Sequence, residues 1–136
     1  MTGAGAPATR AARAGTVTLA FVVGIIYGSV ATIGHRNELR VGELVIPWGL
    51  VAAILGVLAL LVGIRLVAGG RLAAAGAAAG ILGTVALLTL PGRGGSVLIA
   101  GDLVGTIWAV APALVAVFVV AWPKLPARRR STAGAA

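Results

Sequence analysis

Four long apolar runs, separated by short charged segments, constrain this chain more than any other feature of its sequence. The runs cover residues 16–33, 47–68, 72–90 and 101–122. A helix needs about 20 apolar residues, each rising about 1.5 Å, to cross a hydrocarbon core of about 30 Å. Because every run approaches that length, the sequence predicts an all-α fold, a polytopic transmembrane bundle of four helices.

The composition excludes two other classes of protein. Hydrophobic residues make up 60% of the chain and charged residues 10%, whereas a water-soluble domain carries about 25% charged residues. A disordered chain needs low hydrophobicity and high net charge, and the apolar runs rule that class out. The formal charge is +8, but the basic residues flank the runs instead of forming a soluble face, so we expect no nucleic-acid partner.

The segments before and after the runs are polar and basic. We interpret residues 1–15 as a disordered cytoplasmic tail and residues 123–136 as a basic cytoplasmic tail, with a transmembrane domain over residues 16–122 between them. A second interpretation treats residues 1–31 as a cleaved signal peptide, because Ser-Val-Ala at 29–31 has the small-x-small form of a cleavage site. Cleavage would leave three spans in the same orientation.

Short connections determine how neighbouring spans are arranged. Residues 35–43 hold five charged or titratable side chains, which predicts a loop outside the lipid. The second helix is expected to begin at Pro47, since proline suits the first helical turn. Residues 69–71 form a very short turn, so the second and third helices are predicted to be an antiparallel hairpin. The GRGGS sequence at residues 92–96 predicts a glycine-rich turn.

Lysine and arginine are distributed unevenly between the two sides of the predicted bundle. Three of the 11 lie on one side, and eight lie on the side of both tails and of the turn at residues 69–71. The positive-inside rule then predicts cytoplasmic termini for a multi-pass protein of the bacterial cytoplasmic (inner) membrane. So strong a bias argues against small exporters and fluoride channels that insert in both orientations. The three acids, which fall on the outer side, are Glu38, Glu43 and Asp102.

Small residues gather on single faces of the predicted helices, and helices in lipid associate through close backbone approach at such faces. We predict that the following glycines pack helices together: Gly24, Gly28, Gly56, Gly76, Gly80, Gly101 and Gly105. Packing within the chain and a face reserved for another subunit both agree with this pattern. The third run begins RLAAAGAAAG, which is small all the way round, so we expect its helix to be central.

Most intramembrane polar groups fall in the outer half of the predicted bundle. Asp102 is the only acid inside an apolar run, where an uncompensated charge costs at least ~2.5 kcal/mol. It is interpreted either as a cap in the first helical turn or as a proton-linked or cation-binding carboxylate. The second interpretation predicts an outward-facing polar pocket, whose alternative is hydrogen bonding between helices. The candidate pocket residues are Tyr27, Thr84, Asp102 and Thr106.

The sequence contains few residues that could catalyse a reaction. The chain has no cysteine, and no nucleophile and base occur as a recognisable pair. His35, Glu38 and Glu43 lack any ligand-spacing motif, so we expect no metal site, no cofactor and no enzymatic activity. The C-terminal arginines are candidates for contact with anionic lipid, with a topology signal as the alternative; they are Arg128, Arg129 and Arg130.

Three features together resemble small four-span integral membrane proteins of high-GC bacteria, which form families of unknown function. The features are a composition rich in Ala, Gly, Val and Arg with a single Lys, the Pro-Trp-Gly entry at residues 47–49, and the Gly-Asp-Leu entry at residues 101–103. The resemblance covers residues 16–122 and rests on layout, so it implies a location and a fold. It implies no activity and no catalytic residue.

Two functional hypotheses follow from the sequence. The leading one is a non-enzymatic integral membrane protein, an accessory or scaffolding subunit that acts through small-residue helix packing. Its partners would be the lipid bilayer and either another membrane protein or a second copy of the chain. The alternative is a small transporter or channel-like protein with the outward-facing polar pocket near Asp102.

Overall fold

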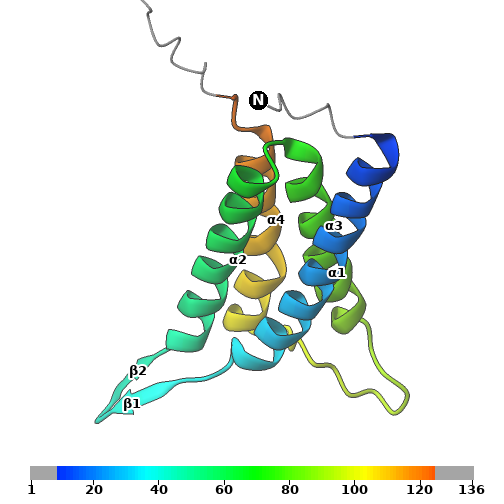
Figure 1. Ribbon diagram of the computed structural model, residues 1–136. Helices are drawn as coiled ribbons and strands as arrows, with labels where there is room; N and C mark the ends of the chain where they lie inside the picture. The colour runs from blue at the N-terminus through cyan, green and yellow to red at the C-terminus, as the bar shows by residue number, and fades with distance from the viewer. Residues whose placement is uncertain (1–8, 125–136) are drawn as a thin grey trace, which may run out of the picture.

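The computed structural model describes residues 9–124. It contains four helices and one two-stranded sheet (Figure 1). All four helices are long and apolar enough to cross a membrane, with mean hydropathies from 1.9 to 2.7, so the predicted fold class is confirmed. In chain order the elements are α1 (Arg10–Gly34), β1 (Leu39–Val41), β2 (Leu44–Ile46), α2 (Trp48–Val67), α3 (Arg71–Thr89) and α4 (Leu103–Ala121).

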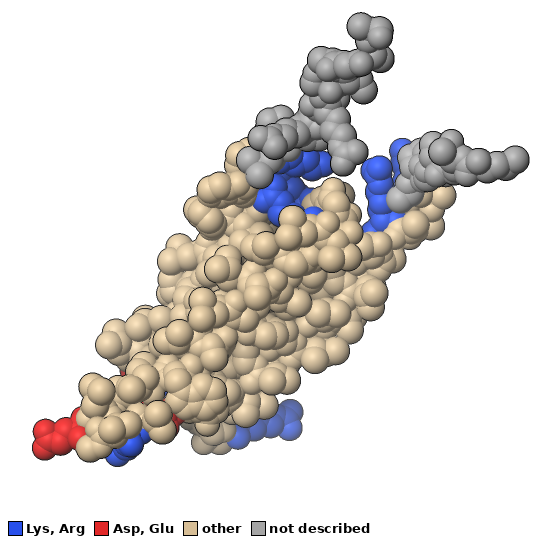
Figure 2. Space-filling model, turned by 60° about the vertical axis from the view of Figure 1, so that its left-hand side comes forward, with Lys and Arg blue, Asp and Glu red and all other residues tan. Residues whose placement is uncertain are grey.

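The start of α1 and the end of α4 lie at the same end of the bundle (Figure 1). We call this the basic end, because it gathers Arg10, Arg13, Arg65, Arg71 and Lys124. The opposite end, which we call the hairpin end, carries β1, β2 and the connection between α3 and α4. In the face that Figure 2 shows, charged side chains lie at the two ends and none lies over the middle. This distribution suits a bundle whose middle is surrounded by lipid.

The first helix begins earlier than the sequence predicts. The Thr9 hydroxyl caps α1 by accepting a hydrogen bond of 3.1 Å from the backbone N–H of Ala12, as N-cap residues do. The following residues, Arg-Ala-Ala-Arg-Ala, are strong helix formers. Residues 10–15, expected to belong to a disordered tail, are therefore helical, while residues 1–8 lie outside the described part of the chain.

The connection between α1 and α2 is a β-hairpin where a plain loop was predicted. Leu39 pairs with Ile46 and Val41 with Leu44 in an antiparallel register. Gly42 takes the positive φ of 63°, which suits the first position of a two-residue type II′ turn. The signal in the sequence was two β-branched and apolar stretches on either side of a Gly-Glu pair.

Helix α3 is the central helix, as its small residues predicted. It contacts α1, α2 and α4, and it has the largest buried share of the four helices. Helices α1 and α3 run in the same direction and make the most extensive contact in the bundle. The residues that α3 buries are Ala73, Ala74, Gly76, Ala77, Ala78, Gly80, Ile81 and Val85.

The fourth helix begins at Leu103, two residues later than predicted, with Asp102 as its N-cap. Its buried residues are Gly105, Trp108, Pro112, Ala116 and Val119, whereas Thr106, a candidate pocket residue, is exposed. A large tryptophan thus lies on the buried face of α4. The bulky residues on the opposite side, such as Leu114 and Phe118, are exposed.

Candidate functional site

The glycine motifs of α1 and α3 face each other. A Cβ atom added to Gly28 would lie 3.2 Å from the Cα atom of Ile81, and one added to Gly76 would lie 2.8 Å from the carbonyl oxygen of Val17. Gly24 and Gly80 likewise meet backbone atoms of the opposite helix. Such close approach of two parallel helices is what GxxxG motifs permit in membranes. These four glycines are therefore used within the chain.

The other three glycines predicted to pack helices behave differently. Gly56 of α2 lies against the phenol of Tyr27, so it makes room for a side chain of α1. Gly105 lies against the carbonyl of Ala100 in the preceding connection, and not against another helix. Gly101 has no atom within 4 Å of an added Cβ and lies before the start of α4. Gly101 therefore packs no helices together within the described part of the chain.

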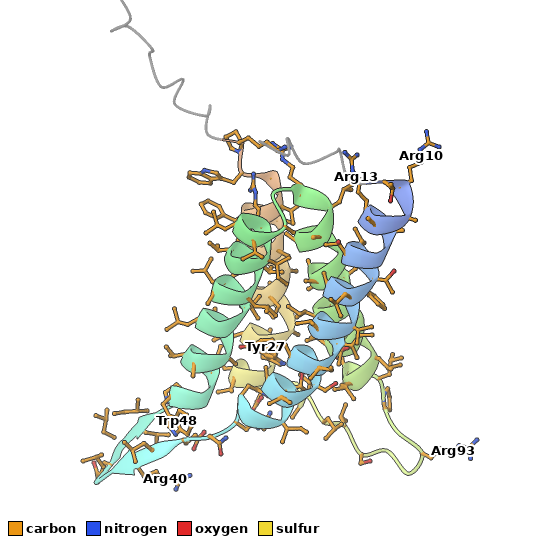
Figure 3. The ribbon with its side chains drawn as sticks, in the orientation of Figure 1. Arg10, Arg13, Tyr27, Arg40, Trp48 and Arg93 are labelled. Atoms are coloured by element: carbon orange, nitrogen blue, oxygen red, sulfur yellow. The ribbon has the colours of Figure 1, made fainter. Side chains whose placement is uncertain are left out.

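The four residues predicted for an outward-facing pocket are not brought together. The Tyr27 hydroxyl, between α1 and α2 in Figure 3, donates to the carbonyl of Ala53 at 2.7 Å. The Thr84 hydroxyl donates to the Gly80 carbonyl of its own helix at 2.8 Å. Thr106 is exposed and Asp102 lies at the bundle end. Hydrogen bonding between helices, the alternative to a pocket, accounts for Tyr27, whereas Thr84 bonds only within α3.

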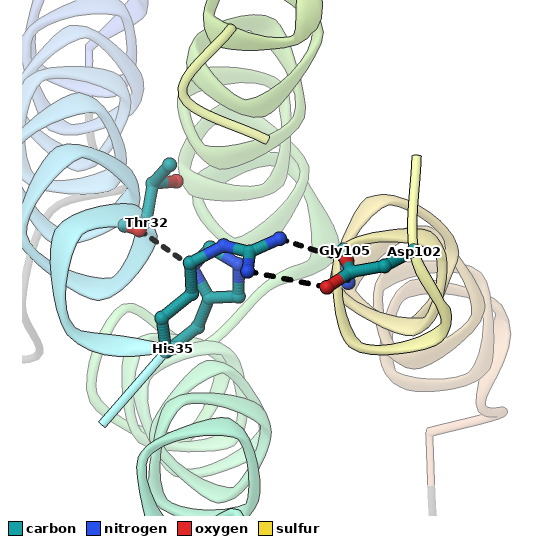
Figure 4. Close-up of polar contacts among 5 residues, drawn as sticks. Thr32, His35, Asp102 and Gly105 are labelled. Atoms are coloured by element: carbon teal, nitrogen blue, oxygen red, sulfur yellow. Dashed lines mark hydrogen bonds and ion pairs between the residues drawn. The ribbon is translucent and has the colours of Figure 1, made fainter. Parts of the chain in front are cut away.

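Asp102 links α4 to the end of α1. Its carboxylate accepts two hydrogen bonds from the Arg36 guanidinium, at 2.7 and 3.2 Å, and one of 2.9 Å from the backbone N–H of Gly105 (Figure 4). The Arg36 guanidinium, and then the Gly105 N–H, hold the pKa of this carboxyl below its ordinary value. The predicted capping role is thus present, together with an ion pair. Nothing in the sequence identified Arg36, because 66 residues separate the partners.

A buried histidine lies directly beside that ion pair (Figure 4). His35 is fully buried and stacks on Trp108, with ring centroids 5.6 Å apart and planes inclined by 16°. Its Nδ1 atom lies 2.5 Å from the carbonyl oxygen of Thr32, so Nδ1 carries the proton. The Trp108 indole N–H donates to the Thr32 hydroxyl at 3.1 Å. These contacts, which we call the α1–α4 clasp, join two helices that otherwise touch little.

The clasp favours the neutral form of His35. Burial, the largest influence, lowers the pKa of His35 below its ordinary value. The Nε2 atom has no hydrogen-bond partner within residues 9–124, so it is an unused acceptor at the hairpin end. We had placed His35 in a flexible loop, yet its ring is among the largest fully buried side chains. No group of three potential metal ligands occurs among the described residues.

The hairpin of β1 and β2 extends away from the helices (Figure 1). Cross-strand partners share one face of a sheet, so the two pairs Leu39–Ile46 and Val41–Leu44 form a single apolar face. The side chains of the first pair are 54% (Leu39) and 39% (Ile46) exposed, and those of the second pair are 59% (Val41) and 62% (Leu44) exposed. The opposite face carries Arg40 and Val45. Four exposed apolar side chains thus lie together outside the bundle.

Two grooves open at the basic end. The first, of about 560 Å³, lies between α2 and α4 and has apolar walls that include Leu58, Val62 and Phe118. The second, of about 470 Å³, lies between the start of α1 and the start of α3. Lys124 lines both grooves. The three arginines at residues 128–130, predicted to contact anionic lipid, lie outside the described residues.

Arg65 is fixed between the two helices that form the first groove. Its guanidinium donates to the backbone carbonyls of Val119 and Trp122, which are the orphan acceptors at the end of α4. A positive charge at this place also complements the dipole of α4. Arg65 therefore joins α2 to the end of α4.

These features define a polytopic integral membrane protein with four spanning helices. In comparisons with protein-family models, with curated proteins and with solved structures, nothing matches this chain.

Proposed function

We propose that this chain is a non-enzymatic accessory subunit of a membrane complex, and that it contacts its partner through the apolar face of the β1–β2 hairpin. The observation that carries the proposal is the group of four exposed apolar side chains outside the helix bundle. Exposed patches of this kind mark interaction sites. The partner would offer an extended, apolar segment of a second membrane protein on the same side of the membrane.

The free edges of the hairpin support a protein partner over lipid. A two-stranded hairpin is marginally stable by itself, and its outer edges present backbone N–H and C=O groups that are ready to pair with another strand. Those same groups make insertion into hydrocarbon costly, since lipid offers them no hydrogen bonds. Glu43 at the tip, Glu38 just before β1 and Arg40 within β1 add charges that disfavour insertion further.

The glycine faces support a scaffold role through packing inside the subunit, whereas the sequence suggested that they could also contact a partner. Since Gly24, Gly28, Gly76 and Gly80 are used between α1 and α3, small-residue packing holds this subunit together and leaves the hairpin to meet the partner. The charge distribution supports an orientation with the basic end in the cytoplasm. The layout resemblance to small proteins of high-GC bacteria supports the cytoplasmic membrane of a bacterium as the location.

Photo-crosslinking in the native membrane tests the proposal. A photoreactive residue placed at Val41 or Leu44 is expected to give one discrete adduct with a second polypeptide. The matched control is the same residue at Val117, which is 67% exposed on α4 and should label lipid. Native mass spectrometry of the gently extracted protein should show the same second polypeptide.

A double substitution separates docking from folding. Val41→Asn with Leu44→Asn should abolish the complex that native mass spectrometry detects, while the thermal unfolding midpoint of the bundle stays unchanged because the hairpin lies outside it. The proposal fails if the hairpin positions label only lipid, or if the only adduct has twice the mass of the chain.

A further inference from the structure

We infer that the basic end binds one anionic phospholipid. Its phosphate lies among Arg13, Arg71 and Lys124, and one of its acyl chains lies in the groove between α2 and α4. The two grooves at this end share Gly69, Gly70 and Lys124, so they form one continuous surface. One part of that surface is basic and the other is apolar, as a phospholipid is acidic at one end and apolar at the other.

The walls of the α2–α4 groove fit an acyl chain. Leu58, Val62 and Leu66 line it from α2, and Phe118 and Trp122 line it from α4. The two aromatic rings pack against each other with centroids 4.9 Å apart. All five side chains are exposed in the isolated chain. A volume of about 560 Å³ falls in the usual range for a ligand site.

The charges at the mouth of the grooves are not neutralised within the chain by acidic side chains. All three acidic residues of the sequence lie at the hairpin end. Arg13, Arg71 and Lys124 line the second groove together, while Arg65 is held by the carbonyls at the end of α4. Basic pockets between transmembrane helices at the membrane surface are typical sites for anionic head groups.

Two other occupants fit the surface less well. Residues 125–136 carry three arginines and no acid, so like charges disfavour this segment at a basic mouth. A soluble phosphate would use the basic part but would leave the apolar walls uncovered. A phospholipid from the adjoining leaflet satisfies both parts, and it needs no soluble route to reach them.

The test measures lipid binding to the full chain by native mass spectrometry with phosphatidylglycerol and phosphatidylcholine as probes. Phosphatidylglycerol should bind more tightly. Arg71→Gln with Lys124→Gln should weaken its binding by about fivefold for each charge removed, or about thirtyfold together. The matched control, Arg40→Gln with Arg93→Gln, removes the same charge at the hairpin end and should leave binding unchanged.

A second pair of variants tests the acyl-chain groove. Val62→Trp fills the groove and should weaken phosphatidylglycerol binding, whereas Val110→Trp places the same ring on an exposed part of α4 outside the groove and should not. Circular dichroism and the thermal unfolding midpoint of each variant check that the bundle is intact.

Three results would overturn the inference. The first is equal binding of the two lipids by the wild-type chain. The second is a loss of phosphatidylglycerol binding on neutralising the arginines at 128–130 that is not seen with the Arg71 and Lys124 substitutions. The third is displacement of phosphatidylglycerol by an equal concentration of glycerol phosphate, which would assign the site to a soluble anion.

Discussion

The α1–α3 pair and the α2–α4 pair differ in the size of the side chains at which their helices pack. Helices α1 and α3 meet through glycines that touch backbone atoms of the opposite helix. Helices α2 and α4 carry larger buried side chains, Leu61 and Trp108, and Arg65 joins the two helices through carbonyls at the end of α4. The first pair leaves a groove only between the starts of its helices, while the second leaves an apolar groove at the basic end. The glycine contacts therefore restrict the space between α1 and α3 to the starts of the two helices.

Substitution at the tight pair should have the largest effect. Gly80→Leu drives a side chain into the backbone of Phe21, Gly24 and Ile25, none of which is a flexible side-chain end. We expect a loss of about 3 kcal/mol or more in the free energy of unfolding, the upper end of overpacking costs. Gly83→Leu, on the same helix with open space around it, is the matched control. Equal thermal unfolding midpoints for both variants would contradict the α1–α3 interface.

Truncation in the looser pair should cost less. Leu61→Ala removes a fully buried side chain of α2. In lipid the separated helices remain in an apolar solvent, so only packing is lost. The cost should stay below the ~2–5 kcal/mol that Leu→Ala causes in a water-soluble core. Leu55→Ala, at a residue 58% exposed on the same helix, should change the unfolding midpoint little. A larger effect of Leu55→Ala than of Leu61→Ala would contradict the assignment of Leu55 to the lipid-facing side of α2.

The hydrogen bond between the two pairs should contribute a smaller amount. Tyr27→Phe removes the donor to the Ala53 carbonyl without changing the ring. Hydrogen bonds between membrane helices average about 0.6 kcal/mol and reach about 1.7 kcal/mol, so the unfolding free energy should fall within that range. Ser29→Ala removes a hydroxyl that bonds only its own helix and serves as the control. If the two variants have equal unfolding free energies, the hydrogen bond from Tyr27 to α2 does not stabilise the bundle.

The pH dependence of the α1–α4 clasp should give the smallest effect near neutrality. The folded pKa of His35 lies below its ordinary 6.5, so its contribution is complete above pH 6.5. It is lost as the pH falls toward the folded pKa, because the unfolded chain binds the proton first. The contribution of Asp102 persists above 3.8 and is lost only below that pH.

A comparison of unfolding midpoints at about pH 8 and about pH 5 measures this dependence. The unfolding midpoint of the wild-type chain should decrease when the pH is lowered from about 8 to about 5. The midpoint of His35→Gln should decrease less. Parallel profiles would mean that His35 titrates alike in the folded and unfolded chains, which is incompatible with its burial against Trp108.

Hydropathy alone predicted the number and approximate bounds of the helices, because each run was long enough to span a bilayer and bounded by charges or proline. The beginning of α1 was missed because its first turn is basic, and hydropathy does not detect a Thr9 cap followed by alanines and arginines. The β-hairpin was missed because charges at Glu38, Arg40 and Glu43 outweighed the strand pattern between them.

The polar residues were predictable in type but not in partner. Asp102 was identified as a cap from its place at the start of a run, and the cap depends only on local backbone. Its bond to Arg36 and the stacking of His35 on Trp108 each join residues more than 60 positions apart. No local pattern encodes such pairs, since they depend on how α1 and α4 are placed around α3.

The sequence by itself determined the class of the protein, the central place of α3 and the separation of charges between the two ends. Those properties follow from length, side-chain size and the cost of charge in lipid, all of which are local. Only the tertiary structure decided which glycines meet, which hydroxyls are used and where a groove remains. These depend on distances between helices, and the distances are set by the side chains that two different segments bring to the same place.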